Sequence, residues 1–146
     1  MNNTRPVIPT VHTVLVIDDI PANFDVAVEH LEARGYRVVI AQDGEEGFQR
    51  AVFVQPDLIL LDVMLPGQDG FEICRRLKAD AKTSGIPVIF MTALSEENDK
   101  LAGFKAGGID YVTKPLCISE VIARVDTHIK LHSMQKQQLT VVKMHT

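Results

Sequence analysis

Asp62 is the residue of this chain whose position most needs a chemical explanation. It ends the apolar run Leu58–Leu61, where a carboxylate loses hydration free energy unless a partner compensates for the loss. A carboxylate can also attack phosphorus as a nucleophile and form an acyl phosphate. Asp62 is therefore the leading candidate for a reactive group.

Other polar side chains follow apolar runs in the same way. They are Asp18 and Asp19 after Val14–Ile17, Thr92 after Val88–Met91, and Lys114 shortly after Tyr111 and Val112. If the runs are parallel strands of one sheet, their ends meet at the edge where open α/β sheets bind ligands. The sequence therefore predicts one site built from several strand ends.

The residue types indicate what such a site would do. Three carboxylates at one edge repel each other, and a divalent cation relieves the repulsion. Magnesium suits carboxylate, carbonyl and water ligands. A lysine ammonium neutralises charge during phosphoryl transfer, and a threonine hydroxyl can donate a hydrogen bond to a phosphoryl oxygen. The combination favours magnesium-dependent phosphoryl chemistry.

Five short apolar or β-branched runs alternate with helical patterns, which is typical of an α/β fold with a parallel sheet. The predicted strands are approximately 13–17, 37–41, 58–61, 88–91 and 110–112. Helices are predicted for about 21–34, after the capping boxes at Asp43 and Asp69, and for about 96–106 after the cap Ser95. The fifth helix contains Ile118 and extends through Leu131.

Length and composition predict a single ordinary domain with short tails. The chain has 146 residues, 46% of them apolar, and a net charge of -4 without a basic cluster. These features give no basis for nucleic-acid binding, and no run is long enough to span a membrane or serve as a secretory signal. We expect a cytoplasmic protein. The five histidines form no cluster and are expected to be solvated.

Four segments together resemble the receiver domains of two-component response regulators. They are Val14–Asp19, Leu60–Pro66 with Asp69-Gly70, Met91–Ala93, and Tyr111–Pro115. The resemblance covers about Val11 to Leu131. It implies one doubly wound, flavodoxin-like sheet of five parallel strands in the order 2-1-3-4-5, with five helices.

The resemblance also implies a role for each site residue. Asp62 would accept a phosphoryl group from a sensor histidine kinase or a histidine phosphotransfer protein. Mg²⁺, with Mn²⁺ as an alternative, would be bound by Asp19, Asp62 and the backbone carbonyl of Met64, and by Asp18 through water. Lys114 would pair with the phosphoryl group and precede a cis peptide bond to Pro115.

Thr92 and Tyr111 would form the switch pair of such a domain. Phosphorylation would draw the threonine hydroxyl inward, and the tyrosine ring would turn into the space it leaves. The surface of the fourth helix, fifth strand and fifth helix would then change, promoting homodimerisation or releasing an attached output domain.

Two features depart from the family pattern. Cys117 stands where a capping Asp, Ser or Asn is usual, so the last helix is expected to begin less firmly or to use another cap. Met64 and Leu94, two residues after Asp62 and Thr92, are apolar and flank the expected route of the attacking water. We therefore predict slow self-dephosphorylation.

Two other functions remain open from the sequence. One is a magnesium-dependent phosphatase or phosphotransferase of the haloacid dehalogenase type, although such enzymes need an acid two residues after the nucleophile, where this chain has Ile20 or Met64. The other is an interaction module that no longer uses phosphate. If the chain is instead a receiver domain, it is a phosphoacceptor that phosphorylates and dephosphorylates only itself, rather than an enzyme with an external substrate.

The predicted domain organisation has three parts. Residues 1–11 form a flexible leader with two prolines, and residues 12–132 form the receiver domain. Residues 133–146 are polar and form either a helical extension or a linker to an output domain that is missing from this chain.

Overall fold

The computed structural model describes residues 10–93 and 97–144 and contains a five-stranded parallel sheet. Its strands are β1 (Thr13–Ile17), β2 (Arg37–Ala41), β3 (Leu58–Asp62), β6 (Val88–Thr92) and β7 (Asp110–Thr113). Their order is β2-β1-β3-β6-β7, which confirms the predicted 2-1-3-4-5 topology. The central strands β3 and β6 are buried along their whole length, as continuous apolar runs in a parallel sheet require.

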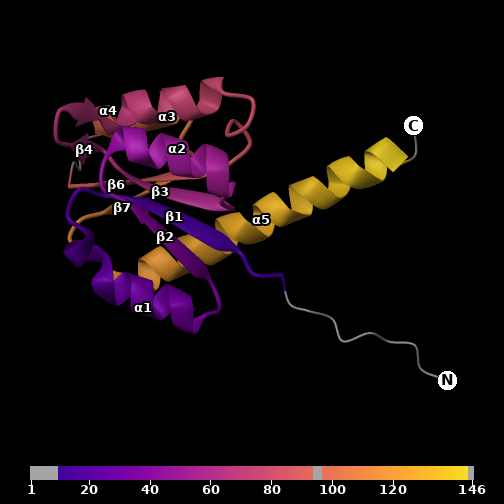
Figure 1. The fold of residues 1–146 in the computed structure, drawn as a ribbon, viewed down its shortest axis with the longest axis horizontal. Helices are drawn as coiled ribbons and strands as arrows, with labels where there is room; N and C mark the ends of the chain where they lie inside the picture. The colour runs from indigo at the N-terminus through magenta and orange to yellow at the C-terminus, as the bar shows by residue number, and fades with distance from the viewer. Residues whose placement is uncertain (1–9, 94–96, 145–146) are drawn as a thin grey trace.

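Helices cover both faces of the sheet (Figure 1). They are α1 (Asp25–Ala33), α2 (Gly44–Val54), α3 (Gly70–Ala79), α4 (Glu97–Lys105) and α5 (Ile118–Met144). Helices α1 and α5 lie on one face, and α2, α3 and α4 lie on the other (Figure 1). This is the doubly wound arrangement expected from the alternating pattern.

Alternate residues of each strand enter two separate cores. Leu15 and Leu61 belong to the core under α2 and α3, whereas Val16 and Leu60 belong to the core under α1 and α5. This division follows from the pleat, which points successive side chains to opposite faces. Helices thus pack on both faces of the sheet, and the residues at the ends of its strands are attached to a well-packed core.

The first predicted helix, 21–34, differs from the structure at its beginning. Pro21–Phe24 form a 3₁₀ turn, η1, and the α-helix begins only at Asp25. No side chain caps the turn at Ile20, and a proline occupies its first position. The tighter 3₁₀ turn therefore leads into the α-helix, as is common at helix N-termini.

A two-stranded antiparallel hairpin between β3 and α3 was not predicted. It consists of β4 (Met64–Leu65) and β5 (Gln68–Asp69), with Gly67 at a φ of 68° in the turn. Strands of two residues carry no periodic hydrophobic signal, so pattern analysis cannot find them.

The two capping boxes are only half formed. Asp43 accepts a hydrogen bond from the Glu46 backbone N–H at 2.8 Å, as predicted. Asp69 instead accepts from the N–H of Phe71, at 2.9 Å. Glu46 and Glu72 bond to arginines of their own helices, and the predicted cap Ser95 lies outside the described residues.

Helix α5 extends well past the sheet as a single rod (Figure 1). It packs on the core through Val121, Val125 and Ile129, after which Leu131 and Met134 are half exposed. The boundary placed at residue 132 remains a prediction, and most of the predicted leader falls outside the described residues. Within the described residues, no helix is both long and apolar enough to cross a membrane.

Candidate functional site

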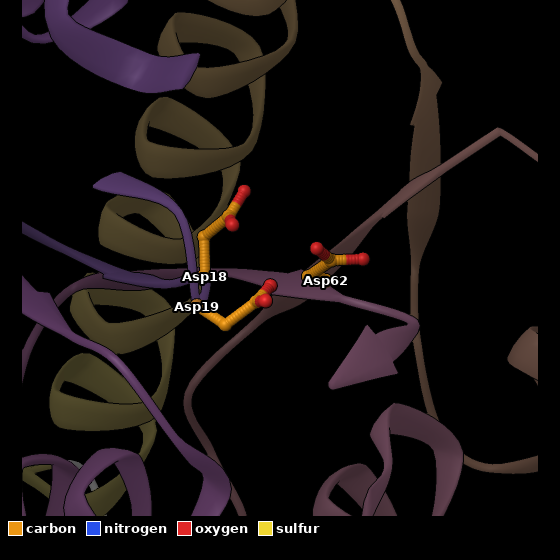
Figure 2. A group of neighbouring side chains, drawn as sticks. All are labelled: Asp18, Asp19 and Asp62. Carbon is orange, nitrogen blue, oxygen red and sulfur yellow. The ribbon is translucent and has the colours of Figure 1, made fainter. Parts of the chain in front are cut away.

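Three aspartates from two neighbouring strands meet at the carboxyl edge of the sheet (Figure 2). Asp18 and Asp19 follow β1, and Asp62 is the last residue of the adjacent β3. One carboxylate oxygen from each lies within 4.8 Å of the others. Asp18 is fully buried and Asp62 is only 5% exposed, so two of these charges are almost entirely shielded from water.

Lys114 provides the positive charge in this cluster. Its Nζ lies 2.7 Å from Asp62 Oδ2 and 3.2 Å from Asp18 Oδ2. The backbone N–H of Lys114 donates to the carbonyl of Thr92 at 2.8 Å, which holds the end of β7 against the end of β6. The Lys114-Pro115 bond is cis, as the resemblance implied.

Backbone N–H groups bind the other oxygens of the buried aspartates. Asp18 Oδ1 accepts from Ile20 N–H at 2.9 Å, and Asp62 Oδ1 accepts from Met64 N–H at 3.0 Å. The chain is tightly packed behind Asp62, because a Cβ on Gly70 would lie 2.3 Å from the Asp62 carbonyl oxygen. Only glycine allows α3 to begin this close to the end of β3.

Burial and charge shift the pKa values of this cluster. Burial raises the pKa of Asp18, and the Ile20 N–H and Lys114 offset only part of that effect. Burial acts to lower the pKa of Lys114, but its contacts with Asp62 and Asp18 outweigh this and leave the pKa raised. The ammonium form of Lys114 is therefore firmly maintained.

The donor set fits a divalent cation of the magnesium type. Three carboxylates face one ammonium group among the described residues, which leaves two negative charges without a counter-charge. All the side-chain donors of the cluster are oxygens, the ligand type that Mg²⁺ prefers. Asp19 and Asp62 could bind such an ion with the Met64 carbonyl.

The predicted switch residues lie on neighbouring strands beside this cluster. Thr92 is the buried last residue of β6, and Tyr111 is half-buried in β7. Both line a small cavity together with Val63 and Phe90. The structure thus brings every predicted site residue to one region of the sheet edge.

Two residues of α4 that sequence analysis did not identify contact Tyr111. The Nζ of Lys100 lies 4.4 Å from the centre of the tyrosine ring. The ring of Phe104 packs edge-on, with 6.3 Å between the two ring centres. No motif marks these residues, because their relation to Tyr111 depends on how α4 lies against β7.

A second charged cluster, on β7 and α5, was also missed. Arg124 Nη1 contacts both Asp110 carboxylate oxygens, at 2.7 and 2.9 Å, and His128 Nε2 lies 2.9 Å from Asp110 Oδ2. The expectation that all histidines are solvated is wrong for His128, whose side chain is only 17% exposed.

Comparison with known proteins identifies the family of this chain. The "Response regulator receiver domain" family matches residues 14–126, most of the chain. The chain belongs to the response regulator receiver family. This receiver domain is therefore a signalling domain of two-component systems.

Known response regulators are similar over most of this receiver domain. It is 50% identical over 112 residues to the DNA-binding dual master transcriptional regulator RpaA of Synechocystis sp., covering 77% of this chain and 46% of that protein. It is 45% identical over 112 residues to the response regulator PleD of Caulobacter vibrioides, covering 77% of this chain and 25% of that protein. This receiver domain thus spans less than half the length of these relatives.

A solved structure supports the same assignment. A putative response regulator from Chloroflexus aurantiacus superposes with a TM-score of 0.78 at 35% identity, covering 83% of this chain and 99% of that chain. The match over nearly the whole of a separate chain agrees with the sheet order and the placement of the helices described above.

Proposed function

We propose that this receiver domain is a phosphorylation-activated switch of the cytoplasm, in which Asp62 accepts a phosphoryl group from a phosphohistidine. The donor is a sensor histidine kinase or a histidine phosphotransfer protein. The observation that carries the proposal is the 2.7 Å contact between Lys114 Nζ and Asp62 Oδ2, beside two further carboxylates. A buried acid with this combination of neighbours suits charge-neutralised phosphoryl transfer.

The chemistry proposed for Asp62 is a nucleophilic displacement. A carboxylate oxygen of Asp62 forms a bond to phosphorus, the phosphorus–nitrogen bond of the donor breaks, and the imidazole nitrogen keeps the electron pair. Lys114 neutralises charge on the phosphoryl oxygens. Asp19, Asp62 and the Met64 carbonyl would bind Mg²⁺, with Asp18 acting through water. The ion would supply further charge neutralisation and orient the phosphoryl group.

The proposed response starts at Thr92. Its hydroxyl moves toward the phosphoryl group, and the ring of Tyr111 turns toward the cavity that both residues line. Because Tyr111 contacts Lys100 and Phe104, a change in its ring position alters the packing of α4 on β7. The surface of α4, β7 and α5 then favours homodimerisation or releases an output domain.

The output domain itself is part of the proposal. This chain covers 46% and 25% of two curated relatives, so those proteins contain further segments. Helix α5 extends beyond the sheet and is suitable for joining the receiver domain to such a segment.

Phosphorylation in the absence of a kinase provides the direct test. The protein is incubated with acetyl phosphate and Mg²⁺, and intact-protein mass spectrometry and peptide mapping locate the added group. We expect one phosphoryl group on Asp62, no uptake by Asp62→Asn, and no uptake after chelation of Mg²⁺. Uptake at another residue, or none by the wild-type chain, would contradict the proposed function.

A further inference from the structure

The loop that follows the phosphoacceptor is bonded to the start of a distant helix. The side-chain oxygen Oε1 of Gln68, in β5, accepts a hydrogen bond from the backbone N–H of Gly44 at 2.7 Å. Gly44 is the first residue of α2, where backbone N–H groups have no partner within the helix. The amide of Gln68 thus provides an acceptor for one of these groups.

The close approach of these two segments depends on Gly44. A Cβ at this position would lie 2.4 Å from Gln68 Oε1 and 2.5 Å from Ile73 Cδ1. A larger residue would therefore push aside the ends of the Gln68 and Ile73 side chains. The space between these two segments therefore fits glycine at position 44.

On one side, Gln68 is the chain neighbour of Asp69, the residue that pairs with Met64. Met64 and Leu65 pair with Asp69 and Gln68 in the antiparallel hairpin. The hairpin is joined to the core at its base, where Gly70 N–H donates to the Val63 carbonyl at 2.8 Å. The bond from Gly44 holds the Gln68 side chain, so movement of Gln68 would shift the adjacent Asp69 and, through the Met64–Asp69 pairing, the backbone of Met64.

On the other side, Gly44 is close in sequence to the strand that supports the other aspartates. Residue Ala41 ends β2, and its carbonyl accepts a hydrogen bond from Asp18 N–H at 3.0 Å. The Gln68–Gly44 bond therefore links the Asp18–Asp19 segment, through the end of β2, to the segment containing Asp62 and Met64. These are the two segments that supply the proposed metal ligands.

We propose that Gln68 is a positioning residue for the divalent-cation site, holding the Met64 carbonyl at a set distance from Asp19 through its bond to Gly44. The inference rests on the proposed function in one respect, because it assumes that the three aspartates and the Met64 carbonyl bind Mg²⁺. In this proposal the side chain of Gln68 does not bind the metal ion itself. Its removal should lower the affinity for Mg²⁺ without removing any ligand.

Calorimetric titration of the unphosphorylated chain with MgCl₂ tests this directly. We expect Gln68→Leu, which has no acceptor, to raise the Kd for Mg²⁺ about three- to tenfold, the effect of losing one hydrogen bond. Gln68→Glu retains an acceptor oxygen beside the helix N-terminus and should bind Mg²⁺ at least as tightly as the wild type. Gln49→Leu is the matched control, because Gln49 lies in α2 and, among the described residues, its side chain bonds to Glu45 alone, at 3.3 Å.

A second measurement separates positioning from a general structural effect. The initial rate of phosphorylation by acetyl phosphate is measured over a range of Mg²⁺ concentrations. For Gln68→Leu we expect a higher half-saturating Mg²⁺ concentration and an unchanged maximal rate. A lower maximal rate with unchanged Mg²⁺ affinity would overturn the inference, as would a wild-type Kd for Gln68→Leu.

The experiments distinguish an error in the proposed function from an error in the role of Gln68. If the wild-type chain neither binds Mg²⁺ nor gains a phosphoryl group, the proposed function is wrong. If the wild-type chain does both and Gln68→Leu behaves in the same way, only the role of Gln68 is wrong.

Discussion

Two charged clusters of this receiver domain use the same kinds of side chain to different effect. In one, Asp18, Asp19 and Asp62 lie together, and the ammonium of Lys114 contacts two of them, Asp18 and Asp62. In the other, Asp110 contacts both Arg124 and His128, and Arg124 also contacts the more exposed Glu120. The first cluster has more buried carboxylates than basic partners, whereas Asp110, the less exposed carboxylate of the second, has both a guanidinium and an imidazole as partners.

The difference distinguishes a site that needs a ligand from a contact that is complete. Partnered contacts lower the pKa of Asp110 although burial opposes them, whereas burial dominates at Asp18 and raises its pKa. A buried excess of carboxylates is costly in free energy, and an added cation offsets that cost. Ionisable residues alone therefore do not mark a functional site, but an unbalanced buried set does.

The largest expected contrast is in metal binding. Asp19→Asn should weaken Mg²⁺ binding by about 100-fold or more, because it removes a proposed ligand rather than an outer contact. Asp110→Asn is the matched control and should leave the Kd unchanged, since Asp110 is not a proposed ligand and already pairs with Arg124. Calorimetry measures both values. Equal losses in the two variants would remove the distinction between the clusters.

Replacing the basic side chain of each cluster by methionine should lower stability by different amounts. Lys114→Met leaves buried carboxylates unpaired and should lower the free energy of unfolding by about 3 kcal/mol. Arg124→Met affects a more exposed pair, and His128 still contacts Asp110, so the loss should be about 1 kcal/mol. Urea unfolding without metal provides both numbers.

The stability of the same two variants can also be compared with and without Mg²⁺. Added Mg²⁺ should recover part of the stability lost in Lys114→Met, because a bound ligand stabilises the folded state, and none of that lost in Arg124→Met. Recovery in neither variant would argue against a cation site at the three aspartates.

The surroundings of the acidic cluster predict the lifetime of the phosphoryl group. The side chain of Met64 is apolar and 67% exposed, and Leu94 lies outside the described residues. Met64→Asn introduces an amide that can orient water, and we expect it to speed hydrolysis about tenfold, within the range for such positioning effects. The decay of phosphorylated protein by mass spectrometry measures this. A half-life of only a few seconds in the wild type would contradict slow self-dephosphorylation.

The smallest expected effect is the acid sensitivity of the cluster around Asp110. Because the pKa of Asp110 is lowered on folding, its contacts stabilise the protein above the ordinary aspartate value of 3.8. That stability is lost as the pH falls from 3.8 through the lower folded pKa. Asp110→Asn should cost about 1 kcal/mol at neutral pH and nothing at strongly acidic pH. Unfolding curves at both pH values decide it, and a loss independent of pH would mean that charge is not the cause.

Much of the architecture was predictable because strands and helices leave local patterns. The five strands of the sheet agree with the predicted runs to within a residue at each end, and Asp43 caps α2 as its sequence indicates. The hairpin at Met64–Asp69 and the 3₁₀ turn before α1 were missed, because two-residue strands and single turns have no period.

The sequence alone determined which groups end the strands, and parallel strands bring their carboxyl ends to one edge whatever the details of packing. Only the tertiary structure decided which groups pair there. Lys114 and Asp18 are separated by 96 residues and Gln68 and Gly44 by 24, and neither pair leaves a pattern in the chain. Contacts of this kind depend on how helices and loops pack across the sheet, because short-range bonds form only where the fold brings donor and acceptor within about 3 Å.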